Sequence, residues 1–419
     1  MTSVRTAEII AVGTELLTPT RTDTNSLWLT ARLNELGIEV RAKAIVGDNR
    51  ADLAALFSQA LGRVDLVVTT GGLGPTEDDV TREVVADVLG LILIEDNAIV
   101  DQLRKRFARR RMSMPENNRR QAQVPKGATL LPNPNGSAPG LWIEMEGKVV
   151  VLLPGPPREL RPLFDTEVAS RLDSQAAGRR VRRRVIKITG RAESQVDEVA
   201  QPIYAALRQG TAPIETTILA SPGLIELHLS AVGADLAAVD VALDAAVEAL
   251  RSALGSVVFS VDGRSLEEVV GDALRDRGWR IATAESCTGG LVLGRLTDVP
   301  GSSAYVVGGV VAYANEVKVR DLNVSPELLA NHGAVSEPVA LAMAEGSLSR
   351  FDVQIAVAVT GIAGPTGGSD AKPVGTVVIA IAGPTSVART FLFPGDRQMV
   401  RAFATAAALD MVRRVLAEA

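Results

Sequence analysis

The chain has 419 residues, more than one hydrophobic core usually organises, so two or three domains are expected. Its 44 Lys and Arg residues and 49 Asp and Glu residues give a formal net charge of −5, which argues against a nucleic-acid-binding protein. Cys287 is the single cysteine, and His228 and His332 are the two histidines, so disulfides, thiolate metal clusters and histidine-based catalytic triads are excluded or nearly so.

The N-terminal part of the chain alternates strand-like and helix-like segments. Strands are expected at residues 7–12, 38–46, 65–70 and 149–153, and helices at residues 25–36, 51–61 and 80–89. This alternation implies a parallel sheet covered on both faces, in a domain that we place at residues 1–172. We expect no signal peptide and no membrane span, because no long apolar segment is present. With the cysteine content, this favours a cytoplasmic protein.

A change of composition at residues 170–182 predicts a domain boundary. The basic run at residues 179–184 is interpreted as the solvated start of a strand rather than a phosphate-binding patch. Beyond it, the expected order is strand, helix, strand, strand, helix, strand, at residues 185–189, 194–207, 216–220, 224–232, 236–254 and 257–260. This is the order of a small split α+β sandwich, which we place at residues 173–260 and interpret as a spacer or assembly module.

The α/β rhythm returns in a third domain, placed at residues 261–419. Helices are expected at residues 266–277, 291–296 and 398–417, and strands at residues 279–284, 306–313, 355–360, 374–381 and 389–393. The predicted fold class is therefore α/β. It comprises two three-layer α/β domains with parallel-rich sheets, joined by a small α+β (split βαβ) middle domain.

The segment AESCTGG, at residues 284–290, places Ser286 where a strand turns into a helix. The N–H groups of a helix start carry partial positive charge, so this is a place to hold an anion or oxyanion, and Gly289 and Gly290 would allow close approach. Lysine can activate a serine without histidine when burial lowers its pKa. Tyr313 and Lys318, in the segment YANEVK, could form such a set with Ser286.

Each of these residues also has a purely structural interpretation. Ser286 could be only a helix N-cap, Lys318 an ordinary surface lysine, and Tyr313 a core residue with a satisfied hydroxyl. Cys287 is the rival nucleophile, although a lone cysteine is more often a small buried hydrophobe. Glu285 is interpreted as a helix-start charge rather than a catalytic acid.

A second candidate site is GGLGPTEDDVTRE, at residues 71–83, which follows a strand and opens a helix. Glycines and helix N–H groups suit a phosphate. Asp78, Asp79 and Glu83 are hard oxygen donors of the kind that Mg²⁺ or a similar divalent metal needs. The structural alternative is that these carboxylates merely complement the helix dipole.

The C-terminal motifs AESCTGG, GSSAYVVGGVVAYANEVK, HGAVSEP, VAVTGIAGPTGG, KPVGTV and PGDR together resemble the CinA C-terminal family of nicotinamide mononucleotide amidohydrolases. The resemblance implies that Ser286 is the nucleophile and that Lys318 and Tyr313 activate it, with no cofactor. It also implies a group of substrate-binding residues: Thr288, Gly289, Gly290, Thr360, Gly361 and Arg401. Arg397 is the alternative to Arg401, and Ala314 departs from the serine common at its position in the family.

The N-terminal motifs AVGTELL, DTNS, VGDN, GGLGPTEDD, MPENNRRQA and LLPGPPREL resemble the molybdopterin-binding-like domain of full-length CinA proteins. That family includes metal-dependent ADP-ribose pyrophosphatases, so the resemblance implies that Asp79 binds metal or acts in catalysis, with Asp78 and Glu83 behind it. It implies a pocket formed by Glu15, Asn25, Gly71, Gly72, Gly74 and Thr76. The segment TPTRTDTN departs from the family pattern at the rim of this pocket.

The leading hypothesis is a bifunctional pyridine-nucleotide salvage hydrolase that takes nicotinamide mononucleotide and ADP-ribose. The first alternative is an amidohydrolase whose N-terminal domain is a catalytically silent nucleotide sensor or dimerisation scaffold. A non-enzymatic competence or DNA-damage partner is the second, and molybdopterin handling, by fold analogy alone, is the third. A homodimer is implied by the family, whereas binding to membranes or nucleic acid is not expected.

Overall fold

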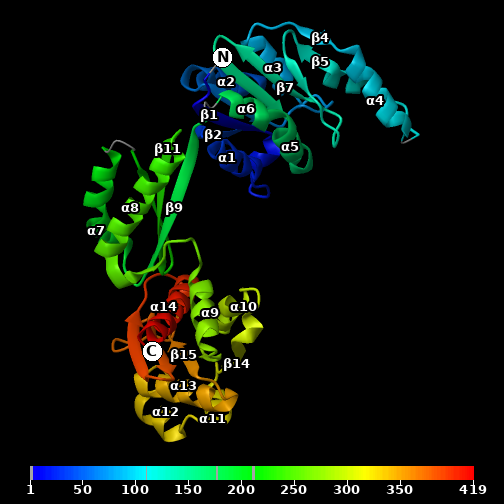
Figure 1. The fold of residues 1–419 in the computed structure, drawn as a ribbon. Helices are drawn as coiled ribbons and strands as arrows, with labels where there is room; N and C mark the ends of the chain where they lie inside the picture. Colours follow the sequence, from blue (N-terminus) through cyan, green and yellow to red (C-terminus); the bar gives the residue numbers. More distant parts are fainter. Residues whose placement is uncertain (1–2, 110, 176–177, 210–212) are drawn as a thin grey trace. The chain divides into compact units, whose positions relative to one another are not determined.

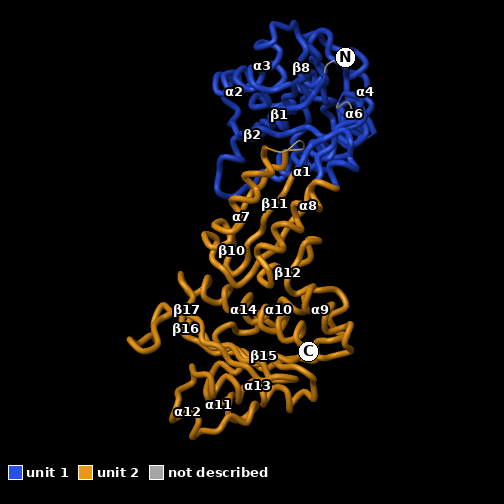
Figure 2. Tube along the Cα trace, turned by 60° about the vertical axis from the view of Figure 1, so that its left-hand side comes forward, with its two compact units in different colours: residues 1–182, 231–240 blue, residues 183–230, 241–419 orange. Residues whose placement is uncertain are grey.

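Figure 1 shows the computed structural model, which describes residues 3–109, 111–175, 178–209 and 213–419. The chain divides into two compact units, one of residues 1–182 with 231–240 and the other of residues 183–230 with 241–419 (Figure 2). Residues 176 and 177, in the predicted boundary region, lie outside the described residues, and the three-domain division stays a prediction. No described helix has the length and apolar character needed to cross a membrane.

A six-stranded sheet organises the N-terminal unit. Its order is β2 (Glu39–Val46), β1 (Thr6–Val12), β3 (Leu66–Thr70), β8 (Lys148–Leu153), β7 (Gly140–Met145) and β6 (Thr129–Leu131). The first four strands are parallel, whereas β7 and β6 are antiparallel to their neighbours. Strand β3 is buried at every position, which explains its unbroken apolar and threonine sequence.

Helices cover both faces of this sheet, as the alternating sequence predicts. They are α1 (Asn25–Glu35), α2 (Arg50–Arg63), α3 (Thr81–Val88), α5 (Pro157–Leu163) and α6 (Ala169–Gln175), with the 3-10 helix η1 (Thr14–Leu17) and the π-helix η3 (Phe164–Val168). Successive residues of β1 point to opposite faces. Ile9 packs in one core with Leu29 and Phe164, and Ile10 packs in the other with Phe57. The three-layer arrangement is therefore confirmed.

Several elements of this unit were not expected from the sequence: strands β6 and β7, helices α5 and α6, and the segment between residues 93 and 125. Strands β4 (Leu93–Glu95) and β5 (Gln123–Pro125) form a two-stranded antiparallel ribbon. Between them along the chain lie helix α4 (Asn97–Arg109) and the 3-10 helix η2 (Glu116–Ala122). Ile99, Val100, Leu103 and Ala122 form the small core of this segment. Strands of three residues are too short to give a periodic signal, which explains why the sequence does not reveal them.

A four-stranded sheet follows, in the order β10 (Glu215–Ser221), β11 (Leu224–Gly233), β9 (Arg180–Thr189) and β12 (Val258–Ser260). Helices α7 (Glu193–Arg208) and α8 (Leu236–Leu254) and the turn η4 (Gly255–Val257) complete this segment. The expected order of strands and helices is confirmed, and α8 has the bounds that the sequence predicts. Residues 210–212, between α7 and β10, lie outside the described residues.

The C-terminal part contains a five-stranded sheet in the order β14 (Val306–Val311), β13 (Ile281–Glu285), β15 (Ile355–Gly361), β16 (Thr376–Ala382) and β17 (Val387–Leu392). Strands β14, β13 and β15 are parallel, and β16 and β17 are antiparallel to their neighbours. The carboxyl ends of the parallel strands therefore meet at one edge, where ligands of α/β sheets commonly bind.

Two helical layers enclose the C-terminal sheet (Figure 1). The helices are α9 (Leu266–Arg277), α10 (Leu291–Thr297), α11 (Asn315–Leu322), α12 (Pro326–His332), α13 (Glu337–Phe351) and α14 (Arg397–Glu418), with the turn η5 (Ser302–Ala304). Val357 packs with α9 and α14 on one face, whereas Ala358 packs with α13 on the other. Helix α13 packs so close to the end of α11 that a Cβ on Gly346 would stand 2.0 Å from the Leu322 carbonyl oxygen.

Candidate active sites

Ser286 lies directly after β13, between the carboxyl ends of the two neighbouring parallel strands. Its backbone N–H donates to the Val359 carbonyl at 2.8 Å, which fixes the residue at the edge of the sheet. The residue is 8% exposed, so its hydroxyl is mostly shielded from solvent. Because it follows β13 directly, Ser286 lies at the sheet edge that the sequence predicts.

Lys318, in the first half of α11, reaches Ser286 from the neighbouring strand connection. Its Nζ lies 3.4 Å from Ser286 Oγ, and it also donates to the carbonyls of Ala312, at 2.8 Å, and Tyr313, at 3.4 Å. The residue is 1% exposed. Burial lowers the pKa of the Lys318 ammonium below its ordinary value, because the charged form loses hydration. The structure therefore brings together the predicted hydroxyl and amine.

Tyr313 is placed differently from the expectation that its hydroxyl activates Ser286. Strand β14 ends at Val311, so Tyr313 lies in the connection to α11 rather than at a strand end. Its side chain is exposed, and its hydroxyl accepts a 2.8 Å hydrogen bond from Arg397 Nη2. Arg397 Nη1 donates to the Gly364 carbonyl at 2.9 Å. Tyr313 thus contacts Lys318 through its backbone carbonyl, and its hydroxyl binds an arginine.

Arg401 lies one turn further along α14 and contacts the Ser286 segment. Its Nη2 donates to the Thr288 carbonyl at 2.9 Å. Two buried polar atoms in this contact have no hydrogen-bond partner among the described residues: Arg401 Nε and Thr288 Oγ1. Thr288 is fully buried. Unpaired buried groups are costly, so these two atoms mark a place where a ligand could supply partners.

Glu285 corrects the expectation that the start of α10 is open to an anion. This residue ends β13 and is 1% exposed. Its carboxylate accepts hydrogen bonds from the N–H groups of Gly290, Val292 and Leu293, at 2.9, 3.1 and 2.8 Å. The first turn of α10 is therefore occupied by the chain's own carboxylate. The interpretation of Glu285 as a helix-start charge is confirmed.

Among the remaining residues of the predicted C-terminal site, Cys287 and Thr360 are buried, Gly290 and Gly361 are partly buried, and Gly289 is exposed. Burial raises the pKa of the Cys287 thiol to about 12, so the rival nucleophile is protonated at neutral pH. Thr360 Oγ1 donates to the Ala334 carbonyl at 2.9 Å. A Cβ on Gly361 would lie 2.7 Å from a methyl of Val377, which explains the glycine. Gly289 and Gly290 have φ angles of +60° and +96°, which favour glycine in this turn.

The N-terminal unit contains a cavity of about 660 Å³ at the carboxyl ends of β1 and β3. Seven residues of the predicted site line it: Glu15, Asn25, Gly71, Gly72, Gly74, Asp78 and Asp79. Asn25 Nδ2 donates to Thr70 Oγ1 and to the Gly155 carbonyl, at 3.1 and 2.7 Å, so α1 is tied to two strand ends. Arg21 and Asp23, from the segment expected at the rim, also line it. Sequence reasoning did not single out Asp48, Glu159 and the prolines of residues 154–157, which are further lining residues.

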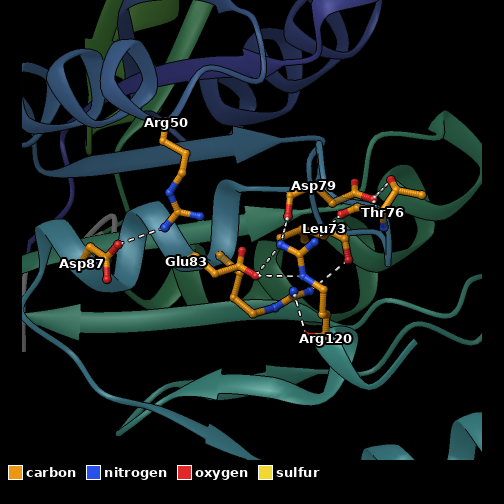
Figure 3. A network of polar contacts seen from close by, with 8 residues as sticks. Arg50, Leu73, Thr76, Asp79, Glu83, Asp87 and Arg120 are labelled. Carbon is orange, nitrogen blue, oxygen red and sulfur yellow. Dashed lines mark hydrogen bonds and ion pairs between the residues drawn. The ribbon is translucent and has the colours of Figure 1, made fainter. Parts of the chain in front are cut away.

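Thr76 and Glu83 are not among the residues that line this cavity. Thr76 donates through its N–H and its hydroxyl to Asp79 Oδ2, at 2.9 and 2.5 Å, and so orients that carboxylate. Glu83 Oε1 instead accepts from Arg120 Nη2 at 2.9 Å (Figure 3). The structure therefore separates Glu83 from the two aspartates with which it was predicted to act.

Arg120, in η2, binds the backbone of the glycine-rich loop (Figure 3). It donates to the carbonyls of Thr76, at 2.6 Å, and Asp79, at 3.4 Å. The fully buried Arg82 donates to the carbonyls of Leu73 and Arg120, at 2.9 and 3.1 Å. These two arginines hold the loop that carries Asp79.

The predicted metal ligands fit a divalent cation only in part. Carboxylates are the ligands that Mg²⁺ prefers, and Asp78 and Asp79 supply two of them at the cavity. Glu83, the third predicted ligand, is paired with Arg120. Among the described residues, no group of three or more His, Cys, Asp or Glu side chains is arranged to hold a metal ion. Metal dependence therefore stays a prediction.

Comparison with known proteins matches both parts of the chain. A family model described as "CinA C-terminal domain" matches residues 263–416, and one described as "Probable molybdopterin binding domain" matches residues 8–174. A CinA-like protein of Koribacter versatilis is 48% identical over 417 residues, covering 98% of this chain and 99% of its own length. A CinA-like protein of Acidobacterium capsulatum is 46% identical over 417 residues, covering 98% of this chain and 99% of its own.

Among solved structures, a competence/damage inducible protein from Agrobacterium tumefaciens is 41% identical to the part of the chain that it matches. The match covers 36% of this chain and 93% of that protein, with a TM-score of 0.35.

Proposed function

Because the chain belongs to the CinA family, with a molybdopterin-binding-like domain before a CinA C-terminal domain, we propose that it is a hydrolase whose C-terminal site deamidates nicotinamide mononucleotide. The observation that carries this proposal is the buried Lys318 amine 3.4 Å from the Ser286 hydroxyl. A lysine whose pKa is lowered by burial can take the proton of a serine at a pH where an exposed lysine is charged. The pair supplies a nucleophile and a base without histidine.

In the proposed reaction, Ser286 Oγ attacks the carboxamide carbon while Lys318 takes the hydroxyl proton. The carbonyl electron pair moves to oxygen, and backbone N–H groups stabilise the oxyanion. When the carbonyl re-forms, the C–N bond breaks and Lys318 returns the proton to the departing ammonia. Water then cleaves the nicotinoyl ester, which releases nicotinate mononucleotide and regenerates Ser286.

The other predicted residues support binding in this proposal. Arg401 offers a guanidinium beside the Ser286 segment, and Arg397 offers one between Tyr313 and the Gly364 carbonyl; a guanidinium suits the substrate phosphate. Tyr313 holds Arg397 with its hydroxyl and accepts from Lys318 with its carbonyl, so it positions both groups.

Ammonia release from nicotinamide mononucleotide tests the C-terminal function. Wild type, Ser286→Ala and Cys287→Ala are compared as full chains. We expect turnover by wild type and Cys287→Ala and none by Ser286→Ala. Turnover retained by Ser286→Ala would move the nucleophile to another residue and overturn the proposal. An inactive wild type would favour the non-enzymatic competence or DNA-damage role, or the molybdopterin role, over the enzyme.

For the N-terminal cavity we propose ADP-ribose as the ligand, with metal-dependent hydrolysis to AMP as its activity. The observation that favours this function is a cavity of about 660 Å³ that is lined by a glycine-rich loop and Asp79. Gly71 and Gly72 have φ angles of +101° and +66°, a conformation that lets a backbone approach a phosphate closely. Asp78 and Asp79 are the residues that would hold a divalent cation, which would polarise a phosphoryl oxygen when bound.

AMP release from ADP-ribose, measured with Mg²⁺ and with a chelator, tests this second function. We expect release only with the metal, and we expect Asp79→Ala to abolish it. Calorimetric binding of ADP-ribose without AMP release would instead identify the domain as a catalytically silent nucleotide sensor. The homodimer stays a proposal from the family resemblance, and the cytoplasmic location stays a proposal from the cysteine content and the lack of a long apolar segment.

A further inference from the structure

The buried carboxylate of Glu285 is an unusual way to begin a helix. Helix caps are normally short polar side chains at the cap residue, whereas Glu285 is the last residue of the preceding strand. It is 1% exposed, and among the described residues its side chain bonds only to the N–H groups of Gly290, Val292 and Leu293. The carboxyl group of Glu285 thus ties the end of β13 to the first turn of α10, across the segment that carries Ser286.

The hydrogen bonds of the turn after β13 can be accounted for one by one. The N–H of Ser286 donates to Val359, that of Gly289 donates to Ser286, and that of Leu291 donates to Thr288. Glu285 takes three further N–H groups of the segment. Within the described hydrogen bonds, the N–H groups of Cys287 and Thr288 are the two in residues 286–293 without an oxygen or nitrogen acceptor. Both face the Cys287 sulfur, which is only a weak acceptor.

These two N–H groups directly follow the nucleophilic serine. Adjacent backbone N–H groups at that position are what stabilises the oxyanion in acyl transfer. A second observation points to a ligand at the same place, because the fully buried Thr288 has a hydroxyl without a partner. Arg401 Nε is likewise unpaired, while Arg401 Nη2 holds the Thr288 carbonyl.

We propose that Glu285 is a positioning residue that holds the Ser286 turn so that the N–H groups of Cys287 and Thr288 receive the carboxamide oxygen. The role rests on the proposed function, since it assigns the oxyanion donors of that reaction. Glu285 takes no proton and contacts no reacting atom. By occupying the first turn of α10, it leaves the two N–H groups next to Ser286 as the donors for the carbonyl oxygen.

The test compares wild type with Glu285→Gln and Glu285→Asp. Glutamine keeps the shape but places an N–H₂ group against backbone N–H donors, and aspartate keeps the charge but shortens the reach. The matched control is Glu268→Gln. Glu268 caps α9 in the same domain by accepting from the Ser265 N–H at 2.6 Å, and among the described residues it makes no hydrogen bond with the Ser286 turn.

Two readouts are measured on the full chain: kcat and KM for ammonia release from nicotinamide mononucleotide, and the rate at which a fluorophosphonate labels Ser286. Labelling forms an Oγ–P bond and expels fluoride, so it needs oxyanion stabilisation but no amide substrate. For Glu285→Gln we expect kcat and labelling to fall about 10-fold or more, with KM near the wild-type value. For Glu268→Gln we expect a lowered melting temperature with both rates retained.

Wild-type rates in both Glu285 variants, or equal slowing by Glu268→Gln, would overturn the positioning role. Absence of labelling at Ser286 in wild type would overturn it as well. If wild type releases no ammonia but its labelling depends on Glu285, the proposed substrate fails and the positioning role stands. If Glu285→Gln does not fold, as judged by circular dichroism, Glu285→Asp decides.

Discussion

Lys318 Nζ lies 3.4 Å from Ser286 Oγ and makes its shorter hydrogen bond, 2.8 Å, with the carbonyl of Ala312. The amine is therefore held by the backbone and directed at the serine before any substrate binds. Carbonyl oxygens favour the charged ammonium, whereas burial disfavours it and lowers the pKa of Lys318 overall. This geometry makes the protonation state of one lysine the switch for the proposed chemistry.

The pH dependence of ammonia release should report this lysine. The base must be unprotonated, so kcat/KM is expected to be low at acidic pH and to rise as pH passes the pKa of Lys318. Because burial lowers that pKa, the midpoint of the rise should lie below the ordinary value of 10.5. A pH profile of wild type checks this, with Cys287→Ala as the control that should share the midpoint. A midpoint at or above 10.5 would contradict the assignment.

Replacing Cys287 should leave catalysis intact. Its thiol is buried and its pKa is raised to about 12, so almost no thiolate exists at neutral pH. We expect Cys287→Ala to keep the wild-type kcat/KM, because the variant retains the backbone N–H. We also expect iodoacetamide to leave the folded wild-type protein unmodified at pH 7, as checked by mass spectrometry. Rapid alkylation would show that the thiol is more reactive than its burial implies.

Removing the Tyr313 hydroxyl should affect binding more than chemistry. Tyr313→Phe deletes the acceptor of the 2.8 Å bond from Arg397 but keeps the carbonyl that contacts Lys318. The expected result is a raised KM for nicotinamide mononucleotide with a smaller change in kcat and an unchanged pH midpoint. Steady-state kinetics measure these quantities. A large fall in kcat with unchanged KM would assign the hydroxyl to activation of Ser286, as the family resemblance implies.

Arg120 should be important for both stability and the N-terminal cavity. Arg120→Met would leave the partly buried Glu83 carboxylate without its cation and release the carbonyls of the glycine-rich loop. We expect a loss of about 1–3 kcal/mol in the free energy of unfolding, and weaker ADP-ribose binding by calorimetry.

The matched control for Arg120 is Arg50→Met, which breaks the exposed pair of Arg50 with Asp87 (Figure 3). Exposed ion pairs contribute about 0–1 kcal/mol, so this variant should unfold near the wild-type denaturant midpoint and bind ADP-ribose normally. Equal effects of the two substitutions would mean that Arg120 acts only as a surface charge.

Much of the fold follows from local signals in the sequence. Helix α9 has the predicted bounds because Ser265 and Glu268 form a capping box at its start and Gly278, in the left-handed conformation, ends it. Strand β14 ends at Val311, two residues before the predicted end at residue 313. The prediction was too long because the apolar run continues into the following connection. The ribbon of β4 and β5 was missed because its strands are short.

In the candidate sites, too, residues with a local sequence signal could be predicted and residues that depend on distant partners could not. The positions of Ser286 and Lys318 could be predicted because each follows one of two neighbouring parallel strands, β13 and β14. The role of Glu83 could not, because its partner Arg120 is 37 residues away and belongs to a segment without periodic signal. Glu285 was predicted as a helix-start charge, but its three N–H partners on α10 were not, since a helix cap is normally sought at the cap residue and not at the end of the preceding strand.

The antiparallel course of β16 has a practical consequence. Ala382, at its end, pairs with Ala356 near the start of β15, so the exposed turn at residues 384–386 lies at the sheet edge opposite Ser286. A peptide tag or fluorophore grafted into that turn would leave access to the serine unobstructed. The same protein could then be immobilised or tracked while its turnover is followed.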